Sequence, residues 1–341
     1  MSDNLPFDSI LIVSFGGPEG PGDVLPFLEN VLRGKNVPRE RMLEVVEHYQ
    51  HFGGVSPINA QNRALIAALR TELDTASVNL PIYWGNRNWH PLLADTLKQM
   101  KADGRRRAIA FFTSMFSCYS GCRQYRENIQ VAQQEVGEGV PTVEKVRKGF
   151  NHPLFIAAQA DLVRRSLAQI AVPQRAATKL LFTAHSIPMS MADNSNYVQQ
   201  LKEAAQLVAA AVGSESWELV FQSRSGPPQQ PWLEPDVCDR LHELAASGTA
   251  AVAIIPLGFV SDHMEVLFDL DTEAKAACDK LGLGMIRVPS VGTHPLFIKM
   301  IRELIQERID SWPTRAAIGD LPASHDVCPV DCCLYPQQRR G

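Results

Sequence analysis

The sequence predicts an α/β protein of two domains, each with a parallel sheet flanked by helices. Three observations carry this prediction. Short apolar segments alternate with longer helical segments along most of the chain, as in βαβ units. The segment 250–256 (AAVAIIP) is apolar on both faces, as in a strand buried inside a parallel sheet. The 341 residues also exceed the roughly 250–300 residues over which one hydrophobic core usually extends.

Strands and helices are expected in two successive sets. The strands are expected at 8–14, 81–84, 107–113 and 142–146, and then at 179–183, 217–222, 250–256 and 284–288. The helices are expected at 23–33, 39–49, 59–73, 92–103, 123–135, 154–169, 197–212, 235–246 and 295–307, with one more from about 261. His90, His152 and His294 each precede Pro-Leu, and proline in a first helical turn loses no hydrogen bond. We therefore expect a helix to begin at each of these three prolines.

The predicted elements divide the chain into four parts. Residues 1–150 form an N-terminal domain, with residues 21–57 inserted after its first strand as a helical lip. Residues 151–292 form a C-terminal domain. Residues 293–312 form a helix that packs back on the first domain, and residues 313–341 form a Cys-rich tail interrupted by prolines.

Composition excludes several functional classes. The chain has 33 Lys and Arg against 37 Asp and Glu, and its net charge of −4 gives no basis for binding nucleic acid. Its first residues lack the basic and apolar regions of a secretory signal. No apolar run approaches the roughly 20 residues that span a bilayer. We expect a cytoplasmic protein, monomeric rather than oligomeric, whose membrane contact would be peripheral.

The seven cysteines are distributed unevenly. Two stand alone in predicted helices, as buried thiols do, and five form two groups. The single ones are Cys238 and Cys278, and the groups are Cys118 with Cys122, and Cys328 with Cys332 and Cys333. In a cytoplasmic protein this clustering favours a metal site or catalysis over a disulfide framework.

Three carboxylates follow the apolar strand at 250–256. Ser261 or Asp262 can cap a helix there. On that helix Glu265, Asp269 and Glu273 are spaced four residues apart, so they share one face. Because like charges at this spacing repel, the stripe does not stabilise the helix. It predicts a route for a divalent cation or for protons, although a solvated helix face fits the same spacing.

Other side chains that can bind a flat ligand or a metal gather at predicted strand ends. They are Phe15, Tyr119 and Trp232 among the aromatic residues, and Arg87, His185, His263 and Glu265 among the ionisable ones. Apolar walls with few polar groups suit a large flat ligand. Imidazole and carboxylate suit a metal such as Fe2+, and histidine also takes up protons near neutral pH. The residues predict a site for a metal and a flat ligand without specifying either.

Several segments resemble one known family, the ferrochelatases. FTAHSIP at 182–188 and GFVSDHME at 258–265 resemble its two signature segments. SFGGP at 14–18, FGGVSPI at 52–58, QSRSGP at 222–227 and PWL at 231–233 resemble further family segments, in order and with matching spacing. The resemblance covers about residues 8–312. PEGP at 18–21, FLEN at 27–30 and YREN at 125–128 are most similar to actinobacterial members, which resemble coproporphyrin ferrochelatases.

The resemblance implies two Rossmann-like, chelatase-type domains with an active-site cleft between them. It also implies insertion of Fe2+ into a free-base porphyrin in heme biosynthesis. His185 would face the metal and accept protons, Glu265 would be its partner across the cleft, and Asp269 and Glu273 would extend the metal route. The residues expected to contact the porphyrin are Phe15, Ser56, Arg87, Tyr119, Trp232 and His263.

Three of these porphyrin contacts have individual expectations. Arg87 and Ser56 are candidates for binding the propionates of the ring, because guanidinium groups suit carboxylates, and either residue equally fits a structural role. Phe15 stands where some family members have a metal-ligating Tyr. Phe15 can therefore only pack against the ring.

The resemblance also leaves a choice of activities. The expected product is iron coproporphyrin (coproheme) from coproporphyrin III, and the alternative is protoheme from protoporphyrin IX. A chelatase for a reduced tetrapyrrole such as sirohydrochlorin shares the two-lobed design but not, on our interpretation, the segments at 223–227 and 231–233. A non-catalytic two-lobed binding protein is the third alternative, and the carboxylate stripe counts against it.

The tail segment CPVDCC at 328–333 resembles the C-terminal cysteine group of family members that carry a 2Fe–2S cluster. Such clusters take four thiolates, and the tail supplies three, Cys328, Cys332 and Cys333. The resemblance favours Cys118 as the fourth ligand, because it lies at a position similar to the internal ligand of animal members. Cys122 and then Cys238 are the alternatives for that ligand. A zinc site and a tail without metal also remain open.

Overall fold

The computed structural model describes residues 5–34, 37–227 and 229–335. Residues 1–4, residues 35–36 of the predicted lip, and residues 336–341 of the predicted Cys-rich tail lie outside the described part. Within the described chain, no helix has the length and apolar character needed to cross a membrane.

The structure contains two four-stranded parallel sheets, which confirms the predicted fold class. The first has the order β2-β1-β3-β4 and the second the order β6-β5-β7-β8. Their strands are β1 Ser9–Ser14, β2 Ile82–Asn86, β3 Arg107–Phe112, β4 Thr142–Lys145, β5 Lys179–His185, β6 Trp217–Gln222, β7 Ala251–Ile255 and β8 Gly284–Arg287. All eight correspond to predicted strands. In both sheets the first and third strands are central, which is why they are the most continuously apolar.

Helices connect the strands in each half. In the first half they are η1 Pro21–Asp23, α1 Val24–Leu32, α2 Arg39–His51, α3 Ile58–Thr75, α4 Leu93–Ala102, η2 Tyr119–Arg123 and α5 Gln124–Val136. The second half contains α6 Pro153–Leu167, α7 Val172–Arg175, α8 Met189–Asp193, α9 Tyr197–Ala211, α10 Val237–Ala246, α11 Met264–Val266, η3 Leu267–Ala274 and α12 Lys275–Leu281. The last helix is α13, Pro295–Ile309. The domain boundaries near residues 150, 292 and 312 stay predictions.

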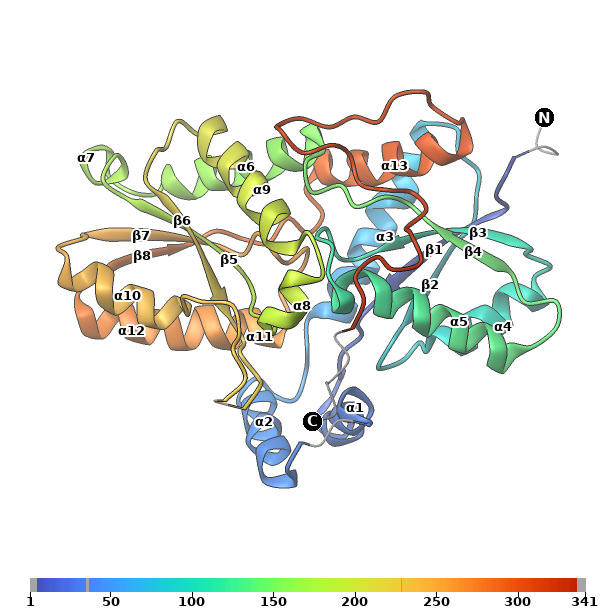
Figure 1. Ribbon diagram of the computed structural model, residues 1–341, viewed down its shortest axis with the longest axis horizontal. Coiled ribbons are helices and arrows are strands. Elements are labelled where there is room, and N and C mark those ends of the chain that lie inside the picture. Colours follow the sequence, from blue (N-terminus) through green and yellow to red (C-terminus); the bar gives the residue numbers. More distant parts are fainter. Residues whose placement is uncertain (1–4, 35–36, 228, 336–341) are drawn as a thin grey trace.

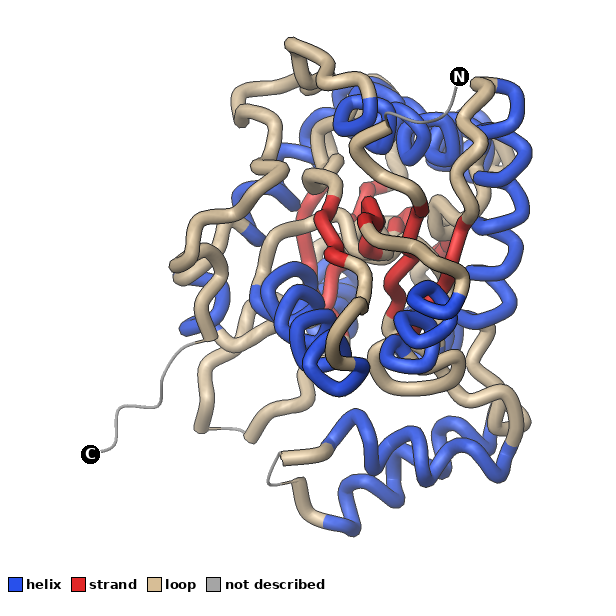
Figure 2. The backbone as a smooth tube through the Cα atoms, turned by 90° about the vertical axis from the view of Figure 1, so that its right-hand side faces the viewer, coloured by secondary structure: helices blue, strands red, loops and turns tan. Residues whose placement is uncertain are grey.

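Helices cover both faces of each sheet (Figure 1). One extended core includes side chains of both sheets together with α3, α6, α9 and α13. The opposite faces have separate cores, formed with α4 and α5 in the first half and with α10, η3 and α12 in the second. α1 and α2 form a small core of their own and extend from the rest of the molecule (Figure 2).

Aromatic side chains join the two halves within the shared core. The Phe297 ring of α13 lies 6.3 Å from Phe111 of β3 and 6.1 Å from Phe155 of α6, measured between ring centroids. α13 also packs against α3. One C-terminal helix therefore contacts elements on both sides of the junction.

Two of the three His-Pro-Leu predictions are confirmed. His152 and His294 cap α6 and α13, and their Nδ1 atoms accept the N–H groups of Leu154 and Leu296. The third prediction is wrong, because α4 begins at Leu93 rather than at the proline after His90. The His-Pro-Leu sequence is the same at all three positions. At the third, the Pro91 carbonyl accepts the Asn86 N–H of β2 at 2.7 Å, and the helix begins two residues later.

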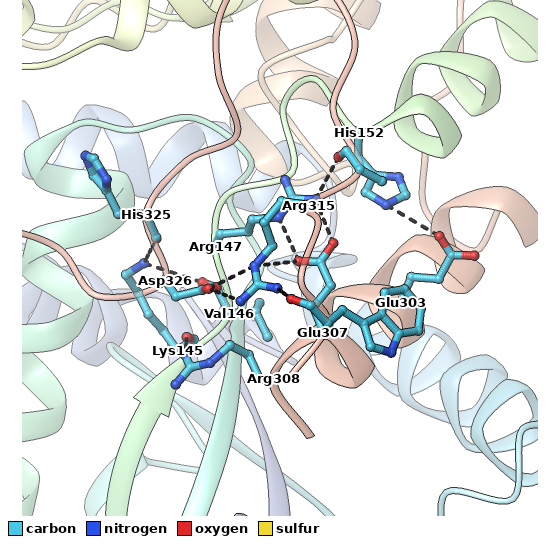
Figure 3. Close-up of polar contacts among 12 residues, drawn as sticks. Lys145, Val146, Arg147, His152, Glu303, Glu307, Arg308, Arg315, His325 and Asp326 are labelled. Atoms are coloured by element: carbon cyan, nitrogen blue, oxygen red, sulfur yellow. Dashed lines mark hydrogen bonds and ion pairs between the residues drawn. The ribbon is translucent and has the colours of Figure 1, made fainter. Parts of the chain in front are cut away.

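The tail is fixed to the core by buried charges (Figure 3). Arg147 and Glu307 are both fully buried and form a two-point ion pair at 2.8 and 2.9 Å. Arg147 also donates to the Ala316 carbonyl at 2.7 Å. Arg315 of the tail lies 3.7 Å from Glu307 and pairs with Asp326 at 2.9 Å. The tail therefore supplies two polar partners of this buried ion pair, the Ala316 carbonyl and the Arg315 side chain.

We predict that Glu307→Gln lowers the free energy of unfolding by about 3 kcal/mol, because it leaves the Arg147 charge buried without its carboxylate. Urea unfolding followed by circular dichroism measures the change. Glu135→Gln is the matched control, since Glu135 pairs with Lys98 on the surface at 3.0 Å. It should lower the free energy by no more than about 1 kcal/mol. Equal midpoints for the two variants would contradict the prediction.

Candidate active site

The site begins at the ends of two adjacent strands of the second sheet. His185 is the last residue of β5. After β7 the chain turns at Gly258, whose N–H donates to the Thr183 carbonyl at 2.9 Å. A β-carbon on Gly258 would lie 2.7 Å from the Cα of Ala184, so this approach requires glycine. The turn returns the chain to His185.

Three ionisable side chains meet there. Nε2 of His185 lies 3.6 Å from Oε2 of Glu265, and Nε2 of His263 lies 3.0 Å from the same oxygen. Nδ1 of His185 contacts the carbonyl of Ser186. The expectation that Glu265 faces His185 across a cleft is wrong, because both residues belong to the second half and are in contact. A flat ligand can therefore approach this pair from one side but cannot lie between its members.

Opposing effects set the pKa values of the pair. Burial alone would raise the pKa of Glu265, but attraction to His185 and hydrogen bonds from both histidines hold it well below its usual range. Burial alone would lower the pKa of His185, whereas the Glu265 charge raises it above its ordinary value. The pair therefore favours a charged carboxylate beside an imidazole that holds its proton to higher pH than usual.

Asp269 and Glu273 continue the series on η3, which is a π-helix rather than the predicted α-helix. Asp269 accepts a hydrogen bond from Gln222 at 3.2 Å and another from Ser223. Burial, together with the charges of Glu265 and Glu273, raises the pKa of Asp269 to about 6. Burial also raises the pKa of Glu273. Asp269 is thus crowded by the negative charges of Glu265 and Glu273, which a cation would relieve.

Phe15 and Arg87 lie at the carboxyl ends of strands in the first sheet. The Arg87 guanidinium lies 5.6 Å from the Phe15 ring centroid and 4.6 Å from that of Tyr125. Its Nε donates to Asn128 at 2.7 Å. Arg87 is therefore already held by protein groups, and a propionate would have to share it with Asn128.

Ser56 and Tyr119 also have protein partners. Ser56 is buried, and a β-carbon on Gly17 would lie 2.9 Å from its Oγ. The Tyr119 hydroxyl donates to Glu127 at 2.9 Å, and its ring lies 4.8 Å from that of Tyr335 in the tail. Burial and Glu127 raise the pKa of Tyr119 to about 12. Tyr119 is thus linked to the tail through its ring and stays protonated at neutral pH.

Trp232 lies near the end of β5. A β-bridge joins it to Pro188, three residues after His185. Its indole packs on Gly226, where a β-carbon would lie 2.2 Å from Nε1. The indole N–H is buried, and no described residue accepts its hydrogen bond. The glycine of the segment QSRSGP therefore leaves room for the ring of the segment PWL.

Contacts from the lip and from α3 complete the arrangement, and the sequence did not predict them. The His48 ring of α2 stacks on Phe268 of η3, with 3.9 Å between centroids. Gln61 of α3 accepts the Asp262 N–H at 2.8 Å. Tyr49 is close enough to Glu265 for that charge, after burial, to raise its pKa. The sequence predicted residues 21–57 as a helical lip, but it did not indicate which residues the lip would contact.

The tail brings its cysteines towards η2. Cys328 lies close to Cys122, and this neighbour is the main reason that the pKa of Cys328 falls to about 6. The Cys332 and Cys333 sulfur atoms lie 3.6 Å apart. Cys118 is buried and accepts the Gly121 N–H at 3.2 Å. The alternative ligand Cys122 thus lies close to the tail, whereas the Cys118 sulfur bonds to Ser120 and Gly121 of its own turn.

Charge interactions with three other cysteines connect Cys333 to these thiols. The pKa of Cys333 is raised first by burial and then by the neighbouring Cys332, Cys122 and Cys118. Across the described residues, no three His, Cys, Asp or Glu side chains meet in the geometry of a preformed metal site. The thiol donors nevertheless fit a thiolate-bound metal group in their chemistry, because the Cys332 and Cys333 sulfurs lie 3.6 Å apart and Cys122 lies close to Cys328. Cys238 and Cys278 lie elsewhere, on α10 and α12.

The sequence of this chain is similar to those of known proteins. The family model Ferrochelatase matches residues 8–309. A protein from Rhodopirellula baltica named Ferrochelatase is 64% identical over 340 residues, covering 99% of this chain and 97% of the relative. A protein from Streptomyces coelicolor named Coproporphyrin III ferrochelatase is 50% identical over 353 residues, covering 97% and 94%.

Among solved structures, SirB from Bacillus subtilis with Fe3+ matches with a TM-score of 0.55 at 15% identity. The match covers 88% of this chain and 95% of SirB. At this identity the likeness concerns the fold alone, and it agrees with the two parallel sheets. The family model spans nearly all of both sheets and α13, and the relatives are matched over almost their full length. The chain belongs to the ferrochelatase family.

Proposed function

We propose that this protein inserts Fe2+ into free-base coproporphyrin III and so makes iron coproporphyrin for heme synthesis. The observation that carries the proposal is the contact between His185 and Glu265, with Nε2 and Oε2 3.6 Å apart at the end of β5. Family membership supports the reaction type. The name and 50% identity of the Streptomyces coelicolor relative support coproporphyrin III as the substrate.

The reaction exchanges one Fe2+ for the two protons on the pyrrole nitrogens, so a base must lie over one face of the ring. His185 can act as this base when its Nε2 is unprotonated. The Glu265 carboxylate then stabilises the imidazolium that forms, and His263 holds Glu265 through the 3.0 Å hydrogen bond. Because His185 and Glu265 touch, the ring lies beside the pair, and one face of it meets both residues.

Fe2+ is the metal substrate of this reaction. Imidazole and carboxylate donors suit a divalent first-row ion. His185 and Glu265 would bind the ion next to the ring, and Asp269 and Glu273 would form the path by which it arrives. Binding a cation removes the charge repulsion that raises the pKa of Asp269.

The ring contacts are Phe15, Ser56, Arg87, Tyr119, Trp232 and His263. Aromatic walls can bend the macrocycle and expose its N–H groups, with the energy coming from contacts away from the metal. Arg87 and Ser56 would bind propionates, with Arg87 shared with Asn128. Porphyrin binding then depends on both halves of the chain, because Phe15 and Arg87 belong to the first and Trp232 to the second.

The cysteines would hold a 2Fe–2S cluster. Cys328, Cys332 and Cys333 supply three thiolates, and Cys122 is now the favoured fourth ligand because it lies close to Cys328. Cys118 is the alternative, as its charge also affects Cys333. The cluster would supply a stable thiolate link between the tail and η2, and no step of metal insertion passes through it.

We further propose that the enzyme is cytoplasmic and monomeric. Its lip at 21–57 would make a peripheral contact with a membrane. Exposed Leu43 and Val55 support the membrane contact. Protoporphyrin IX remains the alternative substrate. Sirohydrochlorin is less favoured, because the likeness to SirB concerns the fold alone.

His185→Ala should lower the rate of iron insertion by at least about 10²-fold, because the ring loses its base. The increase in metalloporphyrin absorbance, with Fe2+ and coproporphyrin III under anaerobic conditions, measures the rate. His242→Ala is the matched control, since His242 is exposed on α10, and it should be as active as the wild type. Absence of turnover in the wild type with any porphyrin would contradict the proposal. A non-catalytic binder would return its porphyrin unmetalated.

Glu265→Gln should lower the pKa of His185, because the charge that raises it is removed while burial remains. Neutral His185 then appears at lower pH, so the acidic limb of the residual pH–rate profile shifts to lower pH. NMR titration of the His185 ring in metal-free protein gives the pKa directly. Glu243→Gln on α10 is the control and should leave it unchanged. A His185 pKa that is the same in wild type and Glu265→Gln would refute the assigned coupling.

Coproporphyrin III should be metalated with a higher kcat/KM than protoporphyrin IX when the two are assayed side by side with Fe2+. Their peripheral groups differ, because coproporphyrin III has additional propionates where protoporphyrin IX has vinyl groups. Arg87→Met should reduce this preference, since it removes a guanidinium partner for carboxylates. A preference for protoporphyrin IX would make protoheme the product.

A further inference from the structure

Around the cysteines, the structure places three cationic side chains that have no carboxylate partner. They are Lys145, Lys148 and Arg126. Each donates to backbone carbonyl groups close to a cysteine, and none forms an ion pair with a described carboxylate.

Lys148 is the most buried of the three, with 4% of its surface exposed. Its Nζ donates to the carbonyls of Ser114 at 2.6 Å and Gly121 at 2.7 Å. Gly121 precedes Cys122 in η2, so the ammonium group is bound to the peptide bond of that cysteine. The ring of Phe112 lies 5.4 Å from Nζ on another side. These neighbours orient the charge without neutralising it.

Lys145 and Arg126 occupy similar positions on the tail side. Lys145 is 8% exposed, and its Nζ donates to the His325 carbonyl at 2.9 Å, three residues before Cys328 (Figure 3). Arg126 donates to the Cys332 carbonyl at 3.5 Å, and its Nε is buried without a partner in the described residues. By contrast, the neighbouring Arg123 pairs with Glu127 at 2.8 Å.

A buried cation without a counter-charge is costly, so an anion nearby would stabilise this arrangement. The other buried cation of this region, Arg147, meets that requirement through Glu307. Near Lys148 the groups that can carry negative charge are the sulfurs of Cys122, Cys118 and Cys328, whose charges interact with it. A metal bound by four thiolates would supply a larger and permanent negative charge.

We propose that Lys148, with Lys145 and Arg126, is the counter-charge for the anionic iron–sulfur group held by the cysteines. These are positioning residues, and the inference rests on the cluster part of the proposed function. Reduction makes a thiolate-bound cluster more negative, and nearby positive charge therefore favours the reduced form and raises the reduction potential. The same charges would also strengthen retention of the cluster.

The test uses the full chain, purified anaerobically and reconstituted with Fe2+ and sulfide. Iron and acid-labile sulfide are counted, and the midpoint potential is measured by dye-mediated titration followed by absorbance and EPR. The variants are Lys148→Met and Arg126→Gln, which each remove one charge, and Lys148→Arg, which keeps it. Lys280→Met removes an exposed charge on α12 in the other half and is the matched control.

Lys148→Met and Arg126→Gln should bind the cluster with a more negative potential and lose iron faster to a chelator. Lys148→Arg and Lys280→Met should resemble the wild type. If Lys148→Met fails to fold, the potential of Arg126→Gln decides. Unchanged potentials in the charge-removing variants overturn the inference, as does a wild type that binds zinc alone or no metal. Metalation of coproporphyrin III, measured in parallel, reports on the active site separately, because an inactive protein with a normal cluster would refute only the chelatase proposal.

Discussion

The close approach of Gly258 to Ala184 is the constraint on which the active site depends. Without a side chain at 258, the loop after β7 can lie against the end of β5 and return Glu265 to within 3.6 Å of His185. Any larger residue would displace that loop, because the contact is with backbone atoms. The parallel sheet fixes His185 and the loop fixes Glu265, so the separation of these two side chains depends on the packing of one glycine.

The same half of the protein carries a series of carboxylates that leads away from His185. The π-helix η3 carries Asp269 and Glu273 away from the histidines, while Gln222 and Ser223 at the end of β6 hold Asp269 by hydrogen bonds. The first half contributes rings and Arg87, together with a lip that reaches η3 through the stack of His48 on Phe268. The proposed ionisable groups thus lie in one half, and the other half contributes aromatic rings and a guanidinium group.

Sequence patterns were sufficient for the strands and for the residues at their ends, because apolar strands of a parallel sheet are continuous and their carboxyl ends meet at one edge. They were insufficient where contacts between distant segments determine which of several locally similar residues or conformations is used. The spacing of Glu265 and Asp269 fitted an ordinary helix, and the sequence did not reveal that both His185 and Glu265 would lie on one side. Cys118 and Cys122 were locally equivalent, but the η2 turn uses the Cys118 sulfur to accept the Gly121 N–H.

The path of the tail has a consequence for how the two halves stay together. Its backbone is bonded to Asn151 at the junction through Ile318 and Leu321, and the Leu321 N–H also donates to Glu203 of α9. From there it runs back to η2 in the first half. The tail is thus a strap across the junction of the two halves, with hydrogen bonds to both. Any group that bound its cysteines only in the folded state would stabilise that state by mass action and so hold the strap in place.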